Sequence, residues 1–321
     1  SPLGRIYNCA RRGLREFLLN FLSDRRRHRV VVIPTYNRAA TISQAISSAL
    51  AQEIPDLEVI VSDDGSTDDT GKVVQAIADP RVRYVRKANG GCSSARNFGV
   101  ANSTRKYVAF LDSDDAWDPG WLATALDILE GDGGFGGVYG SILSETKEGV
   151  RLGVFDLTDG GRFAEATVPY VLTKCMGLLG SNIIARREAV NAIDGWDESF
   201  PTSGYLDFGL RLATDYRVAL VGDPVIRLRE TPGSLSKNVN TGNRLRVLDR
   251  FEQRRPDLAA QHAEIIRKSR ARILRSYGDD LLALRRIKEA EGRLLASLQT
   301  APTWPAFWLL LKAQAMKLVA R

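Results

Sequence analysis

The stretch that decides the fold is Tyr107-Val108-Ala109-Phe110-Leu111-Asp112-Ser113-Asp114-Asp115-Ala116-Trp117. Its first five residues are apolar and predict a buried strand. Three carboxylates then follow within four positions. Crowded carboxylates repel one another unless a cation lies among them, and oxygen ligands suit Mg²⁺ or Mn²⁺. Since proteins usually hold Mg²⁺ with one or two carboxylates and substrate phosphates, the stretch predicts a strand that ends at a metal and phosphate site.

A purely structural interpretation of the same acids is that they are turn and helix-cap residues before Pro119. We adopt it for Asp118, which we expect to cap a helix whose first residue is Pro119. For Asp112 and Asp114 we favour ligand binding.

Outward from this stretch, apolar runs alternate with amphipathic segments, as in a parallel α/β sheet. Polar clusters follow the strands at their carboxyl ends, where open α/β sheets bind ligands. A glycine-rich segment, 131–137, reads as a flexible connection, and 138–243 is more irregular. From about residue 244 we expect a helical hairpin packed on the sheet domain. Strands are expected at 29–33, 57–61, 82–85 and 107–111, and helices at 41–51, around 73–77, at 93–101, over 119–129, 258–276 and 279–298.

Composition and charge describe a globular protein with two basic ends. Of the 321 residues 44% are hydrophobic and 26% are charged, which suffices for a sizeable core. The net charge is +6 over residues 1–29, −8 over 30–243 and +9 over 244–321. Three scattered cysteines indicate a reducing compartment without disulfides. With no signal-peptide pattern and no apolar run of spanning length, we expect a cytoplasmic protein.

Four motifs in order resemble family 2 glycosyltransferases with the GT-A fold. They are Val31-Val32-Ile33-Pro34-Thr35-Tyr36-Asn37-Arg38, Val61-Ser62-Asp63-Asp64-Gly65-Ser66-Thr67-Asp68, Ala95-Arg96-Asn97 and Leu111-Asp112-Ser113-Asp114-Asp115. The resemblance covers roughly residues 29–243. It implies a Rossmann-like mixed sheet flanked by helices, with a C-terminal helical extension at 244–321 and a basic amphipathic helix at 1–28.

The resemblance also assigns a nucleotide-sugar site to the first half of this domain. Pro34, Thr35 and Tyr36 would line the base pocket, and Asp64 would accept a hydrogen bond from the nucleobase. Arg96 would face the nucleotide or its diphosphate. Asp112 and Asp114 would bind the ribose and, with Asp115, a divalent Mn²⁺ or Mg²⁺ ion that neutralises the leaving diphosphate.

The acceptor half departs from the family pattern. Trp196 lies in a segment that resembles the floor of the acceptor site, and it is either a sugar platform or part of the core. The family's Glu-Asp-x-Asp-x-Trp-x-Arg string reads Gly204-Tyr205-Leu206-Asp207-Phe208-Gly209-Leu210-Arg211, so Tyr205 occupies the position of the general base. Because a neutral tyrosine is a poor base, we take Asp207 as the candidate base and place Tyr205 on the acceptor side. In a later motif, Thr231 stands where the family often has histidine.

Two functions remain open after these departures. The favoured one is an inverting, metal-dependent transfer from a UDP-sugar to a hydroxyl of a glycan or polyprenyl-linked acceptor in surface polysaccharide synthesis. A catalytically weak or inactive nucleotide-sugar-binding pseudoenzyme is the alternative. A nucleotidyltransferase would need a glycine-rich, arginine-containing loop after the first strand, and Pro34-Thr35-Tyr36-Asn37 is not one.

Both ends of the chain combine basic and apolar residues at helical spacing. Phe17, Leu18 and Phe21 lie among arginines, and Trp304 and Trp308 lie near Lys312. This composition predicts peripheral attachment to an anionic membrane, on the inner face of the plasma membrane. Packing on the protein itself or on another subunit, including a homo-oligomer, explains the same residues. Without a recognition motif, nucleic acid is not an expected partner.

Overall fold

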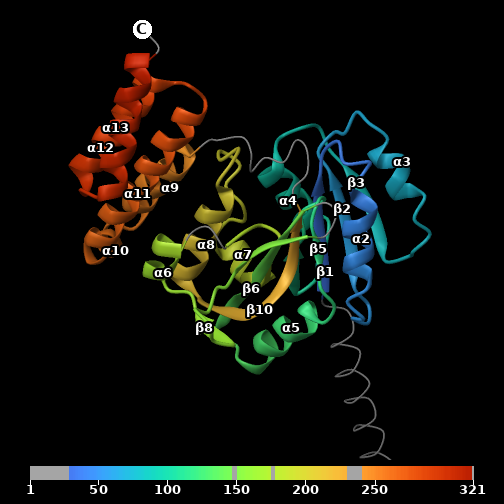
Figure 1. The fold of residues 1–321 in the computed structure, drawn as a ribbon. Helices are drawn as coiled ribbons and strands as arrows, with labels where there is room; N and C mark the ends of the chain where they lie inside the picture. Colours follow the sequence, from blue (N-terminus) through green and yellow to red (C-terminus); the bar gives the residue numbers. More distant parts are fainter. Residues whose placement is uncertain (1–28, 147–149, 175–177, 230–240, 320–321) are drawn as a thin grey trace, which may run out of the picture.

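The protein, described by a computed structural model for residues 29–146, 150–174, 178–229 and 241–319, is built around one ten-stranded mixed sheet (Figure 1). The main path of strands is β3-β2-β1-β4-β9-β6-β10-β5, while β7 pairs with β6 and β8 pairs with β10. Strands β3, β2, β1 and β4 are parallel, whereas β9 runs antiparallel to β4 and β6. The strands are β1 (Arg29–Thr35), β2 (Glu58–Asp63), β3 (Val82–Arg86), β4 (Tyr107–Phe110), β5 (Ala116–Trp117), β6 (Phe135–Glu145), β7 (Arg151–Phe155), β8 (Phe163–Glu165), β9 (Ile183–Arg186) and β10 (Arg217–Arg229).

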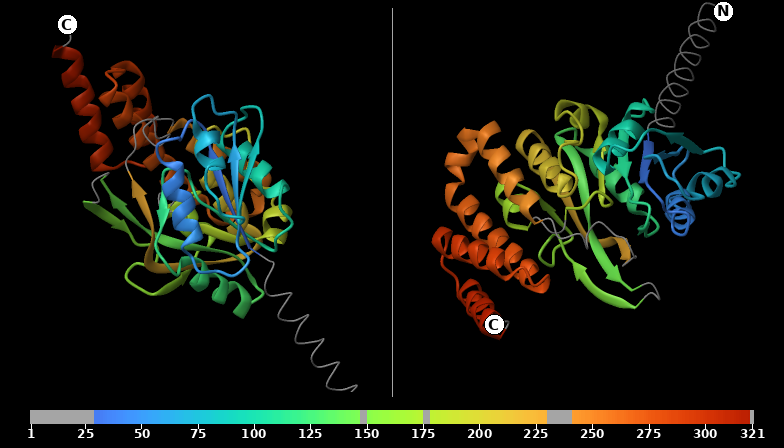
Figure 2. Two further views of the ribbon diagram at one scale, coloured as in Figure 1. Left: turned by 90° about the vertical axis from the view of Figure 1, so that its right-hand side faces the viewer. Right: turned by 90° about the horizontal axis from the view of Figure 1, so that it is seen from above.

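Helices cover both faces of the sheet and extend beyond one of its sides (Figures 1 and 2). Those of the sheet domain are α2 (Ile42–Leu50), α3 (Thr70–Gln75), α4 (Cys92–Ala101), α5 (Trp121–Gly131), α6 (Val168–Lys174), α7 (Arg187–Ala192) and α8 (Gly204–Asp215). Those of the extension are α9 (Gly242–Arg254), α10 (Pro256–Gln261), α11 (Ala263–Ala283), α12 (Ile287–Thr300) and α13 (Trp304–Val319).

The period-two alternation of β1 divides the apolar residues between two cores. Val31 and Ile33 face a core that includes the buried sides of α2 and α5. Val30 and Val32 face the opposite core, to which α7 and α8 contribute. Since alternate residues of a strand point to opposite faces, a fully apolar strand such as β1 must be covered on both sides. The expected mixed α/β architecture is confirmed.

The helical extension belongs partly to the sheet domain. Val247, Leu248 and Phe251 of α9 are buried in the same core as β1 and α8. The Ser269 hydroxyl of α11 donates to the Leu172 carbonyl of α6 over 2.6 Å. Beyond this contact, α12 and α13 pack with the end of α11 around a separate small core. In the described parts of the chain, no helix is both long and apolar enough to cross a bilayer.

Several expected boundaries were wrong for reasons that lie far away in the sequence. Helix α5 begins at Trp121 after Gly120, and Asp118 is no cap because it pairs with Arg227 of β10 at 2.6 Å. The expected loop 131–137 includes the start of β6, since Gly137 pairs with both β9 and β10. The two helices expected at 258–276 and 279–298 are separated at 284–286, where Arg285 has a φ of 59°, and not at 277–278. The predicted helix at 1–28 lies outside the described residues.

Gly99 allows α4 to approach β1 closely. A Cβ at Gly99 would lie 2.3 Å from Cγ1 of the fully buried Val32. We expect Gly99→Ala to lower the free energy of unfolding by about 1–3 kcal/mol, because a packed core cannot easily accept another methyl group. Gly292→Ala is the matched control, since Gly292 is also helical but has open space around its Cα. It should raise stability by about 0.5–1 kcal/mol. Urea unfolding measures both, and equal effects would contradict this account of Gly99.

Candidate functional site

The predicted donor residues meet at one edge of the sheet. In the β1–β2 register Thr35 lies beside Asp63, and in the β1–β4 register Val32 lies beside Phe110. The chain therefore leaves β1, β2 and β4 at the same edge, which brings Tyr36, Asp64 and Asp112 to neighbouring positions. This is the carboxyl edge at which parallel sheets bind ligands.

Asn37 fastens the loop after β1 to the loop after β2. Its backbone takes a left-handed φ of 53°, and its N–H donates to Ser66 Oγ over 2.9 Å. Its side-chain oxygen accepts from the Thr67 N–H over 2.8 Å. Tyr36, the preceding residue, remains 44% exposed, whereas Thr35 is buried. The two loops thus form a braced edge on which the Tyr36 ring is accessible for stacking.

Asp64 organises the loop that leads into α4. Its carboxylate is buried and accepts hydrogen bonds from the Gly90 and Gly91 N–H groups over 2.9 and 2.7 Å. Lys87 Nζ lies 3.0 Å from the same carboxylate. Because a carboxylate offers about four acceptor positions, roughly one is left for a nucleobase N–H. The structure therefore shows that Asp64 positions this loop, and its contact with the base stays a prediction.

Arg96 and Asp112 form the centre of the site. The Arg96 guanidinium is buried and lies 2.5 Å from Asp112 Oδ1, while its Cζ lies 4.3 Å from the Trp196 ring centre. Gly180 makes room for it, since a Cβ there would be 2.1 Å from the guanidinium. The pair fixes a cation and a carboxylate side by side where the nucleotide is expected.

Asp114 and Asp115 have different surroundings, although both were predicted to bind the metal ion. Asp115 is buried and accepts a 2.5 Å hydrogen bond from the Ser181 hydroxyl, whose oxygen in turn accepts from the Asp112 N–H. The Asp114 carboxylate has a 17% exposed side chain and lies 3.9 Å from Arg38 Nε. Asp115 therefore braces the loop, and Asp114 is the more accessible oxygen ligand.

This donor set fits a divalent ion that shares its ligands with a substrate. Within the described ranges, no three His, Cys, Asp or Glu side chains converge to form a complete protein cage. One accessible carboxylate next to a phosphate site is nevertheless the common arrangement for Mg²⁺. Cys92, near the same acids, offers no thiolate ligand or nucleophile at neutral pH, since burial raises the pKa of its thiol to about 11.

Trp196 lies under the site as part of the core. It is 1% exposed, its ring stacks on Phe208 with centres 4.3 Å apart, and it meets Phe110 edge-on at 5.2 Å. Asn97 fixes its backbone from both sides, accepting from the Trp196 N–H and donating to its carbonyl over 2.9 and 2.8 Å. Of the two interpretations open from the sequence, the structure supports the core role.

Tyr205 lies in the first turn of α8, close to the donor site. A Cβ at the neighbouring Gly204 would lie 3.0 Å from Ser93 Oγ in the first turn of α4, the helix that carries Arg96. The Tyr205 hydroxyl accepts a 3.2 Å hydrogen bond from Arg244 of α9. An arginine thus approaches the position where the family has its base. Thr231 lies outside the described residues.

Asp207, the candidate base, faces a different part of the molecule. Its Oδ2 receives Nε and Nη2 of Arg211 over 2.8 and 2.6 Å, and its Oδ1 lies 3.3 Å from Arg254 of α9. Its side chain is only 4% exposed. With both oxygens engaged by guanidinium groups, Asp207 is poorly arranged to take a proton, and the geometry argues for a structural role.

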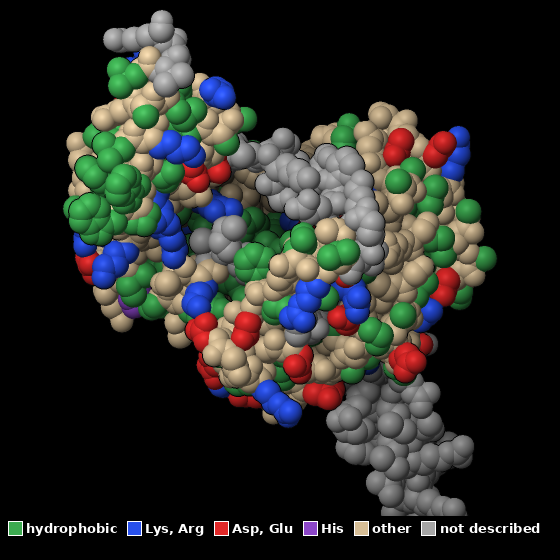
Figure 3. Space-filling view, in the orientation of Figure 1, with side chains coloured by type: hydrophobic (Ala, Val, Ile, Leu, Met, Phe, Trp, Pro, Cys, Tyr) green, Lys and Arg blue, Asp and Glu red, His purple; other side chains and the backbone are tan. Residues whose placement is uncertain are grey.

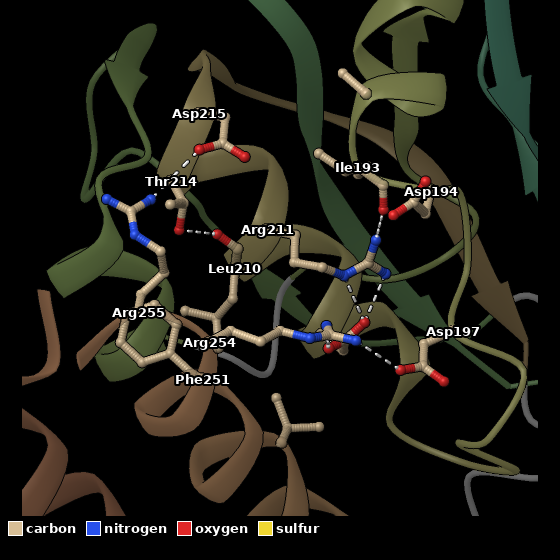
Figure 4. A pocket seen from close by; sticks show the side chains of 13 residues that line it. Ile193, Asp194, Asp197, Leu210, Arg211, Thr214, Asp215, Phe251, Arg254 and Arg255 are labelled. Atoms are coloured by element: carbon tan, nitrogen blue, oxygen red, sulfur yellow. Dashed lines mark hydrogen bonds and ion pairs between the residues drawn. The ribbon is translucent and has the colours of Figure 1, made fainter. Parts of the chain in front are cut away.

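These groups line a cavity of about 310 Å³ between α7, α8 and α9 (Figure 4). Arg254 reaches across it toward Asp197, and Arg211 points to the Ile193 carbonyl. Burial alone would raise the pKa of Asp197, but hydrogen bonds from Ser199 and Arg250 outweigh it and lower the pKa to about 2. The charged network therefore joins the extension to the sheet domain behind the site.

Gly209, which replaces the family's tryptophan, packs beside the buried Tyr139. A Cβ at Gly209 would lie 3.5 Å from the Tyr139 hydroxyl and 3.4 Å from Leu178. These are ordinary van der Waals distances, so a small side chain would fit at this position. Sequence reasoning assigned no role to Ser181 or Arg244, because neither lies in a motif and both reach the site only through long-range packing.

Residues 30–193 match the family model described as "Glycosyl transferase family 2". The chain belongs to glycosyl transferase family 2. Among curated relatives, a Campylobacter jejuni GalNAc(5)-diNAcBac-PP-undecaprenol beta-1,3-glucosyltransferase is 39% identical over 123 residues, covering 37% of this chain and 39% of the relative. The Escherichia coli chondroitin synthase is 39% identical over 121 residues, covering 37% of this chain and 18% of the synthase. The chain thus spans well under half of these relatives' lengths.

Solved structures confirm the GT-A fold of this family 2 chain. Staphylococcus aureus TarS 1–349 in complex with UDP-GlcNAc superposes with a TM-score of 0.64 at 18% identity, over 90% of this chain and 88% of TarS 1–349. The mannosyltransferase PcManGT from Pyrobaculum calidifontis, in complex with GDP-Man and Mn²⁺, gives 0.57 at 20% identity, over 91% and 81% of the two chains. The likeness includes the helical extension, since it covers more of the chain than the family model does.

Proposed function

We propose that this protein is an inverting glycosyltransferase that moves a sugar from a UDP-sugar to a hydroxyl of a glycan or lipid-linked acceptor. The observation that carries the proposal is the Arg96–Asp112 pair, set at one sheet edge with Tyr36, Asp64 and Asp114. Tyr36 would stack on the base, Asp64 would accept from it, and Arg96 would hold the diphosphate. These three contacts together suit a nucleoside diphosphate, which is the part of a nucleotide-sugar that leaves in the transfer.

The acceptor hydroxyl would attack the anomeric carbon while the bond from that carbon to the diphosphate breaks. The relative that acts on an undecaprenol-linked glycan and the chondroitin synthase support a lipid-linked or polysaccharide acceptor and a role in surface polysaccharide synthesis. Peripheral attachment at the inner face of the plasma membrane would place the enzyme beside such acceptors.

We propose Asp114 as the protein ligand of a divalent ion, with Asp112 directed to the ribose and Asp115 bracing the loop from behind. A bound Mn²⁺ or Mg²⁺ would neutralise the charge that builds on the leaving diphosphate. The Mn²⁺ complex of PcManGT supports the choice of ion. Arg38, whose Nε lies 3.9 Å from Asp114, would help to orient the carboxylate.

A second candidate function is binding of a nucleotide-sugar without transfer. It is favoured by one observation, namely that Tyr205 and Arg244 occupy the base position while Asp207 is engaged by two arginines. Both candidates require donor binding, so they differ only in turnover. Release of UDP from UDP-GlcNAc with Mn²⁺ and a lipid-linked glycan acceptor supports transfer, whereas saturable binding without turnover supports the binding protein.

Tyr36→Ala tests the donor site itself. Loss of base stacking is expected to weaken UDP-GlcNAc binding by about 1–3 kcal/mol, which is roughly a 5- to 150-fold rise in Kd. Titration calorimetry with Mn²⁺ present measures this change. Phe155→Ala is the matched control, because Phe155 is equally exposed at 44% but lies on β7. If the two variants bind UDP-GlcNAc alike, the base pocket is not at Tyr36.

A further inference from the structure

Helix α13 carries large apolar side chains on the face that packs on the protein and also on its outer face. The inner face, which packs with α11 and α12, consists of Ala306, Leu309, Leu310, Ala313 and Met316. The outer face carries Trp304 and Trp308, which are 75% and 64% exposed. An ordinary surface helix has charged and polar residues on its outer face, so these tryptophans need an explanation.

The outer residues form a stripe along the helix, which is densest in the first two turns. Their spacing of three, four and seven positions places them on one face. Trp304 is 75% exposed, Trp308 64% and Leu318 73%, while Phe307 and Leu311 are 41% and 38% exposed. Ring centres of Trp304 and Phe307 lie 5.9 Å apart, so the first turns present an aromatic cluster. Apolar side chains gather over the outer side of the extension, with basic ones beside them (Figure 3).

The helix itself carries charge of one sign. Residues 304–319 contain Lys312 and Lys317 and no acid. Lys312 is 59% exposed and, four residues after Trp308, borders the stripe, with its Nζ 3.9 Å from Asp279 of α11. Lys317 donates to Glu291 of α12 over 2.8 Å. Over the described residues of the extension, 242–319, sixteen basic residues face eight acidic ones. Tryptophan and phenylalanine beside lysine, with no acid on the helix, is the composition of a helix lying in the plane of an anionic bilayer.

We propose that the stripe formed by Trp304, Phe307, Trp308, Leu311 and Leu318 is a membrane-docking surface, and that its partner is a bilayer containing anionic lipid. The aromatic rings would enter the interface between headgroups and acyl chains, and Lys312 would remain among the headgroups. This surface specifies how the protein would reach a lipid-linked acceptor. It therefore extends the proposed function but does not depend on turnover.

The test uses the full chain and vesicles of phosphatidylglycerol and phosphatidylcholine, with pure phosphatidylcholine for comparison. We expect flotation with the anionic vesicles, and at least a tenfold weaker partition for Trp304→Ala/Trp308→Ala. The control is Leu152→Ala/Phe155→Ala, which removes two apolar side chains of β7 that are 54% and 44% exposed. It should float like the wild type. UDP-GlcNAc binding by all variants shows that the sheet domain is folded.

A second readout locates the contact on α13 itself. The chain has five tryptophans, and Trp117, Trp121 and Trp196 are buried. Phosphatidylglycerol with brominated acyl chains should therefore quench only Trp304 and Trp308. Flotation without quenching, or equal binding to neutral vesicles, would overturn the proposal. A third result would also overturn it: light scattering shows a wild-type dimer, Trp304→Ala/Trp308→Ala is a monomer, and neither the wild type nor the variant floats. The stripe would then be a protein interface. By contrast, a wild type that floats but does not bind UDP-GlcNAc would count only against the proposed enzyme function.

Discussion

Asp207→Asn is expected to destabilise the protein by about 3 kcal/mol, because breaking a buried ion pair leaves an uncompensated charge. The substitution keeps the size of the side chain but removes the charge that holds Arg211 and Arg254. Arg211 would remain largely buried among neutral oxygens, namely the asparagine amide oxygen and the Ile193 and Gly195 carbonyls. The midpoint of urea unfolding measures the loss.

Asp215→Asn is the matched control for this change. Asp215 lies on the same helix and lines the same cavity, but it is 54% exposed and pairs with Arg255 at 3.4 Å. An exposed pair of this kind contributes under about 1 kcal/mol. The opposite result would restore Asp207 as the base: unfolding midpoints equal to the wild type, with transfer reduced by roughly 10²-fold or more.

Asp114→Asn is expected to lower transfer by about 10²–10³-fold, as the loss of one group that stabilises transition-state charge commonly does. Its stability should change little, because the Asp114 side chain is partly exposed and its distance to Arg38 is 3.9 Å. Initial rates of UDP release across a Mn²⁺ titration are the measurement. A higher Mn²⁺ requirement would place the metal at this carboxylate.

Asp115→Asn provides the contrast. Asp115 is buried and accepts from Ser181, so its loss should lower the unfolding midpoint by an amount equivalent to about 1–3 kcal/mol. Its Mn²⁺ dependence should stay close to that of the wild type. If Asp115→Asn shifts the Mn²⁺ requirement and Asp114→Asn does not, the assignment of the two carboxylates is reversed.

The meeting of the motif residues at one sheet edge could be predicted from sequence because its information is local. Strands β1, β2 and β4 are short apolar runs, each followed directly by its polar motif, and parallel strands bring such motifs to one edge. The boundaries failed where a distant segment decided them. Asp118 pairs with Arg227 and does not cap the helix. Gly137 belongs to a strand because β9 and β10 flank it.

Motif order and apolar periodicity are properties of the chain alone, so the family and the mixed α/β fold could be predicted from the sequence, and the donor-binding roles of the motif residues stay a prediction. Only the tertiary structure separated residues that share a motif. Ser181, 66 positions from Asp115, draws that carboxylate inward and leaves Asp114 accessible, and Arg254, 47 positions from Asp207, engages the candidate base. Ion pairs and hydrogen bonds form wherever the fold brings partners within about 3 Å, and no local pattern encodes that proximity. For the same reason, only packing revealed that α13 turns its tryptophans out.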